Sequence, residues 1–311
     1  MTPVPSSNNR WLVLVGGGGC GRWQAGALDA LAQAGLLSDL AGIVGTSVGG
    51  INACLLGASL AQGRGAGGVI QAWAAIQKDE DIYKPSLTAI LGKWWAHPFD
   101  VLGAAKGFLF GPAAVDTTPL ADLAHKFLDG WNTDRVQSIT GIQVRARALN
   151  YSTGVADTLK GDMVAMVLCT SAIEGVFPRR WQYGDGGAVD NCPIDVALAN
   201  GGQQILVVYC GPEDPLPIEA PEVAVDSTHE DKNGSTGLKD GLAVLSSITQ
   251  MNETMVDQAA TAAELKGLCR VVHCYPTEST GSALDFTERG LLQRGQQEAA
   301  KAITEAKALG W

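Results

Sequence analysis

Short apolar runs alternate with stretches of helix formers along the N-terminal part of the chain. Trp11–Val15 is a continuous apolar run that ends in glycines, a pattern typical of a buried parallel strand. Gln, Ala and Leu recur from Trp23 to Ala34, which indicates a helix with Gly35 as its C-terminal cap. A second strand at Ala41–Val44 and a helix at Val48–Leu60 follow. This order of strand, glycine turn, helix, strand, sharp turn and helix predicts an α/β fold.

The same alternation continues toward the C-terminus. The pattern predicts strands at Gln143–Asn150, Gln203–Cys210 and Arg270–Tyr275, a helix or strand at Met163–Cys169, mainly helical structure over 69–131, and helices over 238–266 and Leu291–Ala308. Residues 211–237 are rich in Pro, Glu, Asp, Ser and Gly, so we expect a surface loop there. We further expect a disordered N-terminus at 1–10 and a single domain over 11–311.

The composition narrows the classes of partner. The chain has 311 residues, of which 46% are hydrophobic and 17% charged, enough to bury a substantial core. The formal net charge of -10 disfavours electrostatic binding to nucleic acid, so we expect no nucleic-acid partner. The acidity also disfavours bulk attraction to an anionic membrane, while it leaves room for a local docking face.

The cysteines and the N-terminus bear on location and cofactors. The seven cysteines are scattered and mostly lie in apolar segments, which indicates reduced, core-filling thiols in a cytoplasmic protein. The one close pair, Cys269 and Cys274, has no second pair at zinc-ligand spacing, so we expect no metal and no cofactor. The polar segment 1–10 makes a poor signal peptide. No apolar run approaches the ~18 residues of a membrane-spanning helix.

Four consecutive glycines, Gly16–Gly19, follow the first apolar run and allow two interpretations. Gly16, Gly18 and Gly21 match G-x-G-x-x-G, the dinucleotide-binding fingerprint, but a glycine-rich chain also produces this match by chance. The dinucleotide hypothesis needs an acidic residue at the end of the second strand to hold the ribose hydroxyls. Gly45-Thr46-Ser47 stands there instead. The sequence therefore favours a role for the glycines in binding an oxyanion.

The second glycine turn, Gly45-Thr46-Ser47-Val48-Gly49, matches the G-x-S-x-G nucleophile elbow. Its serine needs small neighbours, because the backbone is strained and the helix passes close by. The helix N-terminus favours the negative charge that develops during catalysis. Two adjacent βα units place both glycine turns at the carboxyl edge of the sheet, so one turn can supply a nucleophile and the other bare N–H groups. The alternative is a glycine-rich helix start without a catalytic role, in a non-catalytic lipid- or nucleotide-binding protein.

A serine nucleophile needs a base, and the residues leave two candidates open. Asp185 is followed by Gly186 and Gly187, a tight turn that can bring a carboxylate close to another backbone, although Asp-Gly is also a common turn dipeptide. A histidine-dependent esterase of the α/β-hydrolase type would instead use one of the four histidines. These are His97, His125, His229 and His273.

In this order, the glycine-rich turn, G-T-S-x-G and D-G-G resemble the patatin-like phospholipase family. Further similar segments are GTSVGGINA at the elbow, TSAIEGVFP at Thr170–Pro178, DGGAVDNCPIDVAL at Asp185–Leu198 and LDFTERGLLQRG at Leu284–Gly295. The resemblance covers Trp11 to Ala302. It implies a three-layer α/β/α fold with a mainly parallel central sheet, and hydrolysis of lipid acyl esters through an acyl-enzyme.

The resemblance also implies roles for single residues. Ser47 would be the nucleophile and Asp185 its base, in a dyad without histidine. The oxyanion hole would consist of the N–H groups of Gly16, Gly17, Gly18 and Gly19. The supporting motif glycines would be Gly21, Gly45, Gly49, Gly186 and Gly187. Because an ordinary Asp has a pKa of about 4 and is a weak base, Asp185 should be desolvated to become effective.

One position departs from the pattern of the family. Its members usually carry Lys or Arg where Cys20 stands, and Arg22, two residues on, either restores this positive charge or points to solvent. The aromatic segment Trp94–Phe110 allows three interpretations: the lining of an acyl channel, a peripheral contact with a bilayer, or an ordinary helical core or lid. The expected partner is a lipid or acyl-ester substrate, and the sequence leaves the oligomeric state open.

Overall fold

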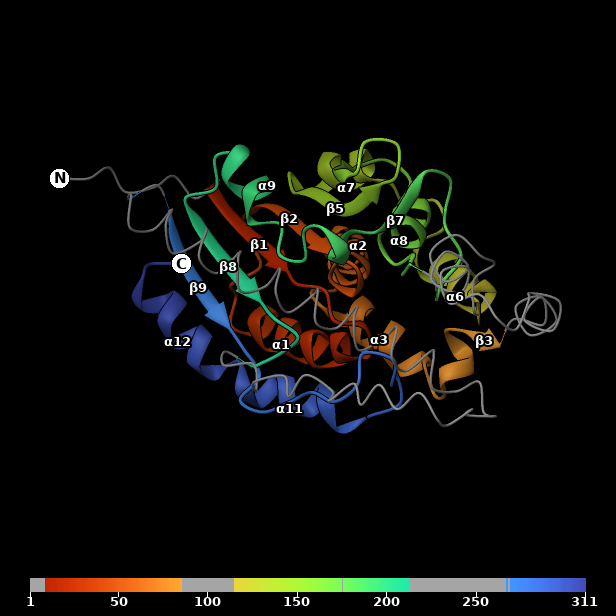
Figure 1. Ribbon diagram of the computed structural model, residues 1–311. Coiled ribbons are helices and arrows are strands. Elements are labelled where there is room, and N and C mark those ends of the chain that lie inside the picture. The colour runs from red at the N-terminus through yellow and green to blue at the C-terminus, as the bar shows by residue number, and fades with distance from the viewer. Residues whose placement is uncertain (1–8, 86–114, 175, 213–266, 268) are drawn as a thin grey trace, which may run out of the picture.

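The structure, a computed structural model, describes residues 9–85, 115–174, 176–212, 267 and 269–311. Its N-terminal part alternates strands and helices (Figure 1). In order these are β1 (Arg10–Leu14), a 3-10 turn (Gly18–Cys20), α1 (Gly21–Gln33), β2 (Leu40–Thr46), α2 (Val48–Ala61) and α3 (Gly67–Ala75). The first strand thus begins at Arg10, inside the segment expected to be disordered, because Arg10 already pairs with both neighbouring strands.

The later elements include four short strands that the sequence pattern does not predict, β3, β4, β6 and β7. They are β3 (Lys84–Pro85), β4 (Val115–Asp116), α6 (Thr118–Leu128), α7 (Thr133–Thr140), β5 (Gln143–Asn150), β6 (Val155–Leu159), α8 (Met163–Thr170), β7 (Tyr183–Asp185), α9 (Ile194–Ala199), β8 (Gln204–Val208), β9 (Arg270–Cys274), α11 (Gly290–Glu298) and α12 (Ala300–Ala308). Further 3-10 turns lie at Asp79–Asp81 and Gly186–Ala188.

A mainly parallel sheet forms the centre of the protein. Its strands follow the order β6-β5-β2-β1-β8-β9, and β7 pairs with β5 as well. The four pairs from β5 to β9 are parallel, whereas β6 and β7 run antiparallel to β5. The carboxyl ends of β1 and β2 therefore meet at one edge of the sheet, where the two glycine turns follow.

Helices cover both faces of this sheet, as Figure 1 shows. Alternate residues of each strand point to opposite faces. Leu12, Leu14 and Leu206 pack in the larger core with α1 and α2, whereas Trp11 and Ile205 pack in a smaller core with α9. The fold class expected from the sequence, α/β with three layers and a mainly parallel sheet, is therefore confirmed.

Several predicted elements differ in detail from the observed ones. Met163–Cys169 lies in a helix, and the predicted closing helix Leu291–Ala308 is two helices that meet at Ala299. Most of the expected loop 211–237 and all of the expected helix 238–266 lie outside the described residues, as does the aromatic segment Trp94–Phe110. None of the helices in the described ranges combines the length and apolar character needed to cross a membrane.

Candidate active site

Strand β5 brings the ends of β2 and β7 together. Thr46, the last residue of β2, pairs with Arg147, and Asp185, the last residue of β7, pairs with Ala148. Because β6 pairs with β5 at both of these positions, β2 and β7 must share the opposite edge of β5. Ser47 directly follows Thr46, so the register places Ser47 and Asp185 side by side.

Ser47 sits on a strained turn between β2 and α2. Its φ of 53° and ψ of -126° lie outside the regions that non-glycine residues favour. The turn is tight: a Cβ at Gly45 would lie 2.2 Å from the Gly49 carbonyl oxygen, and one at Gly49 would lie 2.1 Å from the Leu14 carbonyl oxygen. Only glycine fits at these two positions, as the nucleophile-elbow interpretation requires.

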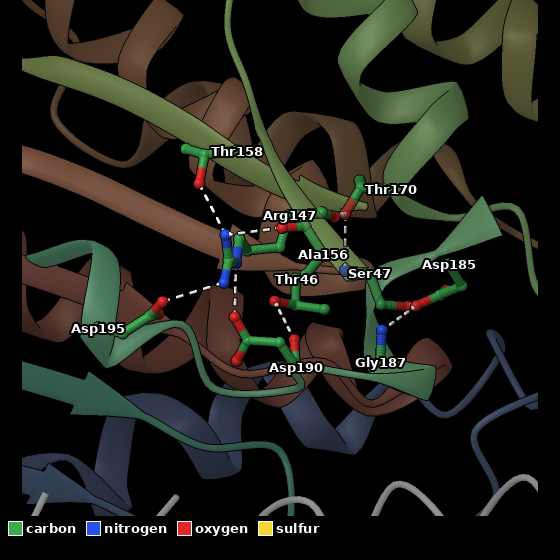
Figure 2. Close-up of polar contacts among 10 residues, drawn as sticks. All are labelled: Thr46, Ser47, Arg147, Ala156, Thr158, Thr170, Asp185, Gly187, Asp190 and Asp195. Atoms are coloured by element: carbon green, nitrogen blue, oxygen red, sulfur yellow. Dashed lines mark hydrogen bonds and ion pairs between the residues drawn. The ribbon is translucent and has the colours of Figure 1, made fainter. Parts of the chain in front are cut away.

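Asp185 accepts hydrogen bonds from both sides. The Ser47 hydroxyl donates to Oδ2 over 2.7 Å, and the Gly187 N–H donates to Oδ1 over 2.7 Å (Figure 2). Burial raises the pKa of Asp185 to about 7, with a further contribution from the charge of Glu174, while the bonds from Gly187 and Ser47 act in the opposite direction. The desolvation that the sequence argument requires is therefore present.

The glycine loop after β1 lies next to Ser47. A Cβ at Gly16 would lie 3.0 Å from the Cβ of Ser47. The N–H of Gly16 donates to the Asn191 carbonyl over 3.3 Å, and the N–H of Gly19 donates to the Ala283 carbonyl over 2.7 Å. Among the described residues, the N–H groups of Gly17 and Gly18 have no acceptor. Two of the four expected oxyanion donors are thus already engaged within the protein.

The supporting motif glycines all lie at close contacts around this site. A Cβ at Gly21 would lie 2.2 Å from Val48, and one at Gly186 would lie 2.7 Å from the Arg147 carbonyl oxygen. A Cβ at Gly187 would lie 3.0 Å from Asn191. Side chains at these positions would separate the elements that carry the glycine loop, Ser47 and Asp185.

An apolar pocket adjoins Ser47. Beside Gly18 and Ser47, mostly apolar side chains from α2, α3, α6 and neighbouring loops line it. Val48, Ile51 and Leu55 follow one face of α2 away from the nucleophile, since residues spaced by three or four positions share a helix face. The lining of the pocket thus extends from Ser47 along about two turns of α2.

Arg22 does not point to solvent, so that alternative of the sequence argument is wrong. Its side chain is 4% exposed, and its guanidinium donates to the carbonyl groups of Trp73, Ile76 and Phe286 over 2.9–3.1 Å. These three residues also line the apolar pocket. Arg22 therefore holds the wall of the pocket together, and burial lowers its pKa. Cys20 is buried as well, with its thiol 3.8 Å from the Thr280 carbonyl oxygen.

Thr170, which the sequence argument did not select, bridges β2 and β5 (Figure 2). The Ser47 N–H donates to Thr170 Oγ1 over 2.9 Å, and this hydroxyl donates to the Arg147 carbonyl over 2.5 Å. The hydroxyl thus continues the hydrogen bonding between β2 and β5 beyond Thr46, where the strand pairing stops. Thr170 has no accessible surface, so water cannot replace this bridge.

Arg147 anchors the loop that follows Asp185, another feature missed from the sequence. Its guanidinium contacts the carboxylates of Asp190 at 2.5 Å and Asp195 at 3.0 Å (Figure 2). The Thr46 hydroxyl donates to the Asp190 carbonyl over 2.9 Å. These contacts fix the loop against β2 and β5. Arg147 lies more than forty residues before Asp190 and Asp195, so no local sequence pattern indicates these ion pairs.

The described histidines lie away from this hydrogen-bonded pair. His273 Nδ1 interacts with the hydroxyl groups of Tyr209 at 3.1 Å and Tyr275 at 3.4 Å. His125 is exposed on α6 and its Nδ1 lies 3.8 Å from Asp129. His97 and His229 lie outside the described residues. Within the described ranges, no group of three or more His, Cys, Asp and Glu side chains could hold a metal ion.

The fold and the site define an α/β protein with a buried serine–carboxylate pair at the carboxyl edge of its sheet. Residues 12–198 match the model of the family described as patatin-like phospholipase, and because this match spans more than half of the chain, the protein belongs to that family. It is therefore a lipid hydrolase by family.

The structure is also similar to the crystal structure of VipD from Legionella pneumophila. The two share 13% sequence identity with a TM-score of 0.42, over 96% of this chain and 67% of the VipD chain. A comparison with curated protein sequences finds no match.

The Thr170 bridge can be tested with two conservative variants. Thr170→Val keeps the shape but removes the hydroxyl, and a buried N–H and C=O left without partners cost about 1–3 kcal/mol of stability each. Because the Ser47 backbone then loses a support, we expect ester hydrolysis to fall roughly 10- to 100-fold in kcat/KM. Thr170→Ser keeps the hydroxyl and should retain most activity. A Thr170→Val enzyme as active and as stable as the wild type would contradict this role.

Proposed function

We propose that the protein is a serine hydrolase that cleaves acyl esters of lipids through a Ser47–Asp185 dyad and an acyl-enzyme. The observation that carries the proposal is the direct 2.7 Å hydrogen bond from the Ser47 hydroxyl to a carboxylate whose pKa burial raises to about 7. A base of this strength is suited to proton transfer near neutral pH. Membership of the patatin-like phospholipase family supports the lipid acyl ester as substrate.

The first half of the reaction forms the acyl-enzyme. Asp185 Oδ2 accepts the hydroxyl proton while Ser47 Oγ attacks the ester carbonyl carbon. The tetrahedral intermediate collapses, its bond to the leaving alkoxide breaks, and the protonated Asp185 returns the proton to the alkoxide. The alcohol leaves, and the acyl group stays on Ser47.

The second half releases the fatty acid. Asp185 accepts a proton from a water molecule as the water oxygen attacks the acyl carbonyl. Collapse of the second tetrahedral intermediate breaks the bond to Ser47 Oγ, which takes the proton back from Asp185. The Gly187 N–H, bound to Oδ1, leaves Oδ2 to face the serine in both halves.

The glycine loop is proposed to stabilise the oxyanion of both intermediates. Gly17 and Gly18 are the best candidates among the four glycines, because their N–H groups have no acceptor among the described residues. Gly18 also lines the pocket at Ser47 and adopts a φ of +55°. Gly16 and Gly19 use their N–H groups to fix the loop, so they would support the hole rather than donate to the oxyanion.

The apolar pocket is proposed to hold the acyl chain. It starts at Ser47 and is lined by Ile51 and Leu55 of α2 and by Phe177. Burial of apolar chain there contributes about 25 cal/mol per Å² of surface removed from water. Because its substrate would be a lipid, the protein is also proposed to contact a lipid surface peripherally. The burial of all seven cysteines supports a reducing compartment such as the cytoplasm.

The histidine-dependent mechanism is the alternative. It would require a histidine to displace Asp185 from the Ser47 hydroxyl, and the two described histidines are engaged elsewhere. The dinucleotide hypothesis finds no support either, since the second strand ends at Thr46 and leads into the buried Ser47.

The dyad is tested by hydrolysis of a soluble p-nitrophenyl ester. Ser47→Ala removes the nucleophile and Asp185→Asn keeps the shape of the base but cannot accept the proton. We expect each variant to lose roughly 1,000-fold or more in kcat, as removal of one member of a catalytic unit does. Thermal melting should show that both variants remain folded.

Single His→Ala changes at all four histidines are the matched controls. They should leave hydrolysis within about threefold of the wild type, since no proton passes through a histidine. Activity that survives Asp185→Asn, or that disappears on replacing one histidine, would contradict the dyad.

The pH dependence follows from the pKa of Asp185. The base works only when it is ionised, so activity is present above this pKa and lost as the pH falls below it. With a pKa of about 7, kcat/KM should fall close to tenfold per pH unit below neutrality. A rate measured from pH 5 to pH 9 that stays flat down to pH 5 would contradict a base with a pKa of about 7.

A further inference from the structure

A second buried carboxyl group, Glu174, lies beside β7, the strand that carries Asp185, and the proposed reaction does not use it. Glu174 is 9% exposed, and its Oε1 accepts a hydrogen bond from the Tyr151 hydroxyl over 2.9 Å. A Cβ added at Gly184 would lie 2.3 Å from this Oε1. Gly184 is the neighbour of Asp185 in β7, so the glycine lets the Glu174 carboxyl press against the strand that carries the base.

The surroundings of Glu174 contain groups that favour its ionised form. Burial raises the pKa of Glu174, and the N–H of Glu174 itself, the Tyr151 hydroxyl, the Arg179 guanidinium and the N–H of Asp185 oppose this rise without reversing it. The Arg179 guanidinium carbon lies 3.8 Å from the centre of the Tyr151 ring, which brings the cation to the same cluster. A carboxylate with this many donors can stay charged although little of it is exposed.

A backbone hydrogen bond holds β7 against the segment that leads into Glu174. In this bond the Asp185 N–H donates to the Ala172 carbonyl over 2.9 Å. Among the described groups that shift the pKa of Asp185, Ser47 and Gly187 act through hydrogen bonds and Glu174 acts through its charge. Ionised Glu174 therefore disfavours the ionised form of Asp185.

We propose that Glu174 is a positioning residue for the reaction: its negative charge, held beside β7 by Tyr151 and Arg179, strengthens the affinity of Asp185 for the Ser47 proton. This inference rests on the proposed Ser47–Asp185 dyad. An isolated aspartate is too weak a base for efficient proton transfer from a serine hydroxyl near neutral pH. The like charge of Glu174 compensates for the absence of a histidine, and it acts only through Asp185.

The experiment compares Glu174→Gln with the wild type in the pH profile of kcat/KM for a soluble ester. Gln keeps the size and can still bond to Tyr151, but it carries no charge. We expect the acidic limb of the profile to move to lower pH by about one unit, the order of change that one nearby charge produces. The plateau rate should fall several-fold, since a weaker base transfers the proton less readily. A merely structural role would lower the rate without moving the limb.

Two further variants accompany this measurement. Glu305→Gln makes the same chemical change at an exposed position on α12 and should leave the profile in place. Tyr151→Phe removes one donor from the ionised Glu174, so it should move the limb in the same direction by a smaller amount. This milder change keeps the proposal testable if Glu174→Gln does not fold.

The outcomes separate the two proposals. An acidic limb at the same pH in folded Glu174→Gln or Tyr151→Phe overturns the role of Glu174 and leaves the dyad intact. A limb that moves to higher pH overturns it as well, because the charge would then favour ionisation of Asp185. Activity that survives Ser47→Ala or Asp185→Asn overturns the dyad itself.

Discussion

The site depends on one constraint, the sharing of a single edge of β5 by two strands that run in opposite directions. β2 occupies this edge up to Arg147, and β7 occupies it from Ala148 onward. Each of these strands ends at the junction, so the next residue of one and the last residue of the other meet there. Backbone hydrogen bonds therefore bring the backbones of Ser47 and Asp185 together.

The strained backbone of Ser47 at this junction costs conformational free energy, which contacts from neighbouring residues offset. A non-glycine residue in the conformation of Ser47 costs about 1–3 kcal/mol, and it persists only where its neighbours determine it. The Thr170 hydroxyl satisfies the Ser47 N–H, and Arg147 holds the loop after Asp185 through Asp190. Loss of one partner from a buried ion pair of this kind costs roughly 3–5 kcal/mol. Pre-organisation of the pair is thus distributed over β5, α8 and the loop.

The sequence predicts the parts of this arrangement that leave a local signal. Gly45 and Gly49 mark the turn at Ser47, and Asp185 precedes two glycines. The strands predicted at β1, β5, β8 and β9 coincide with the observed ones within one or two residues. Thr170, Arg147 and Glu174 leave no such signal, because their roles arise only when distant segments are paired. The three-residue strand β7 is too short for a hydrophobic pattern. The break at Ala299 lies inside an uninterrupted run of helix formers and depends on tertiary packing.

The central claim is that Ser47 is a nucleophile activated by Asp185 alone. Its most direct test is covalent labelling with a fluorophosphonate, which reacts with an activated serine, followed by intact-mass measurement and peptide mapping. The account predicts a single adduct on Ser47, formed faster as the pH rises through about 7 and almost absent in Asp185→Asn. An adduct on another residue, or labelling of Ser47 at an undiminished rate in Asp185→Asn, would contradict it.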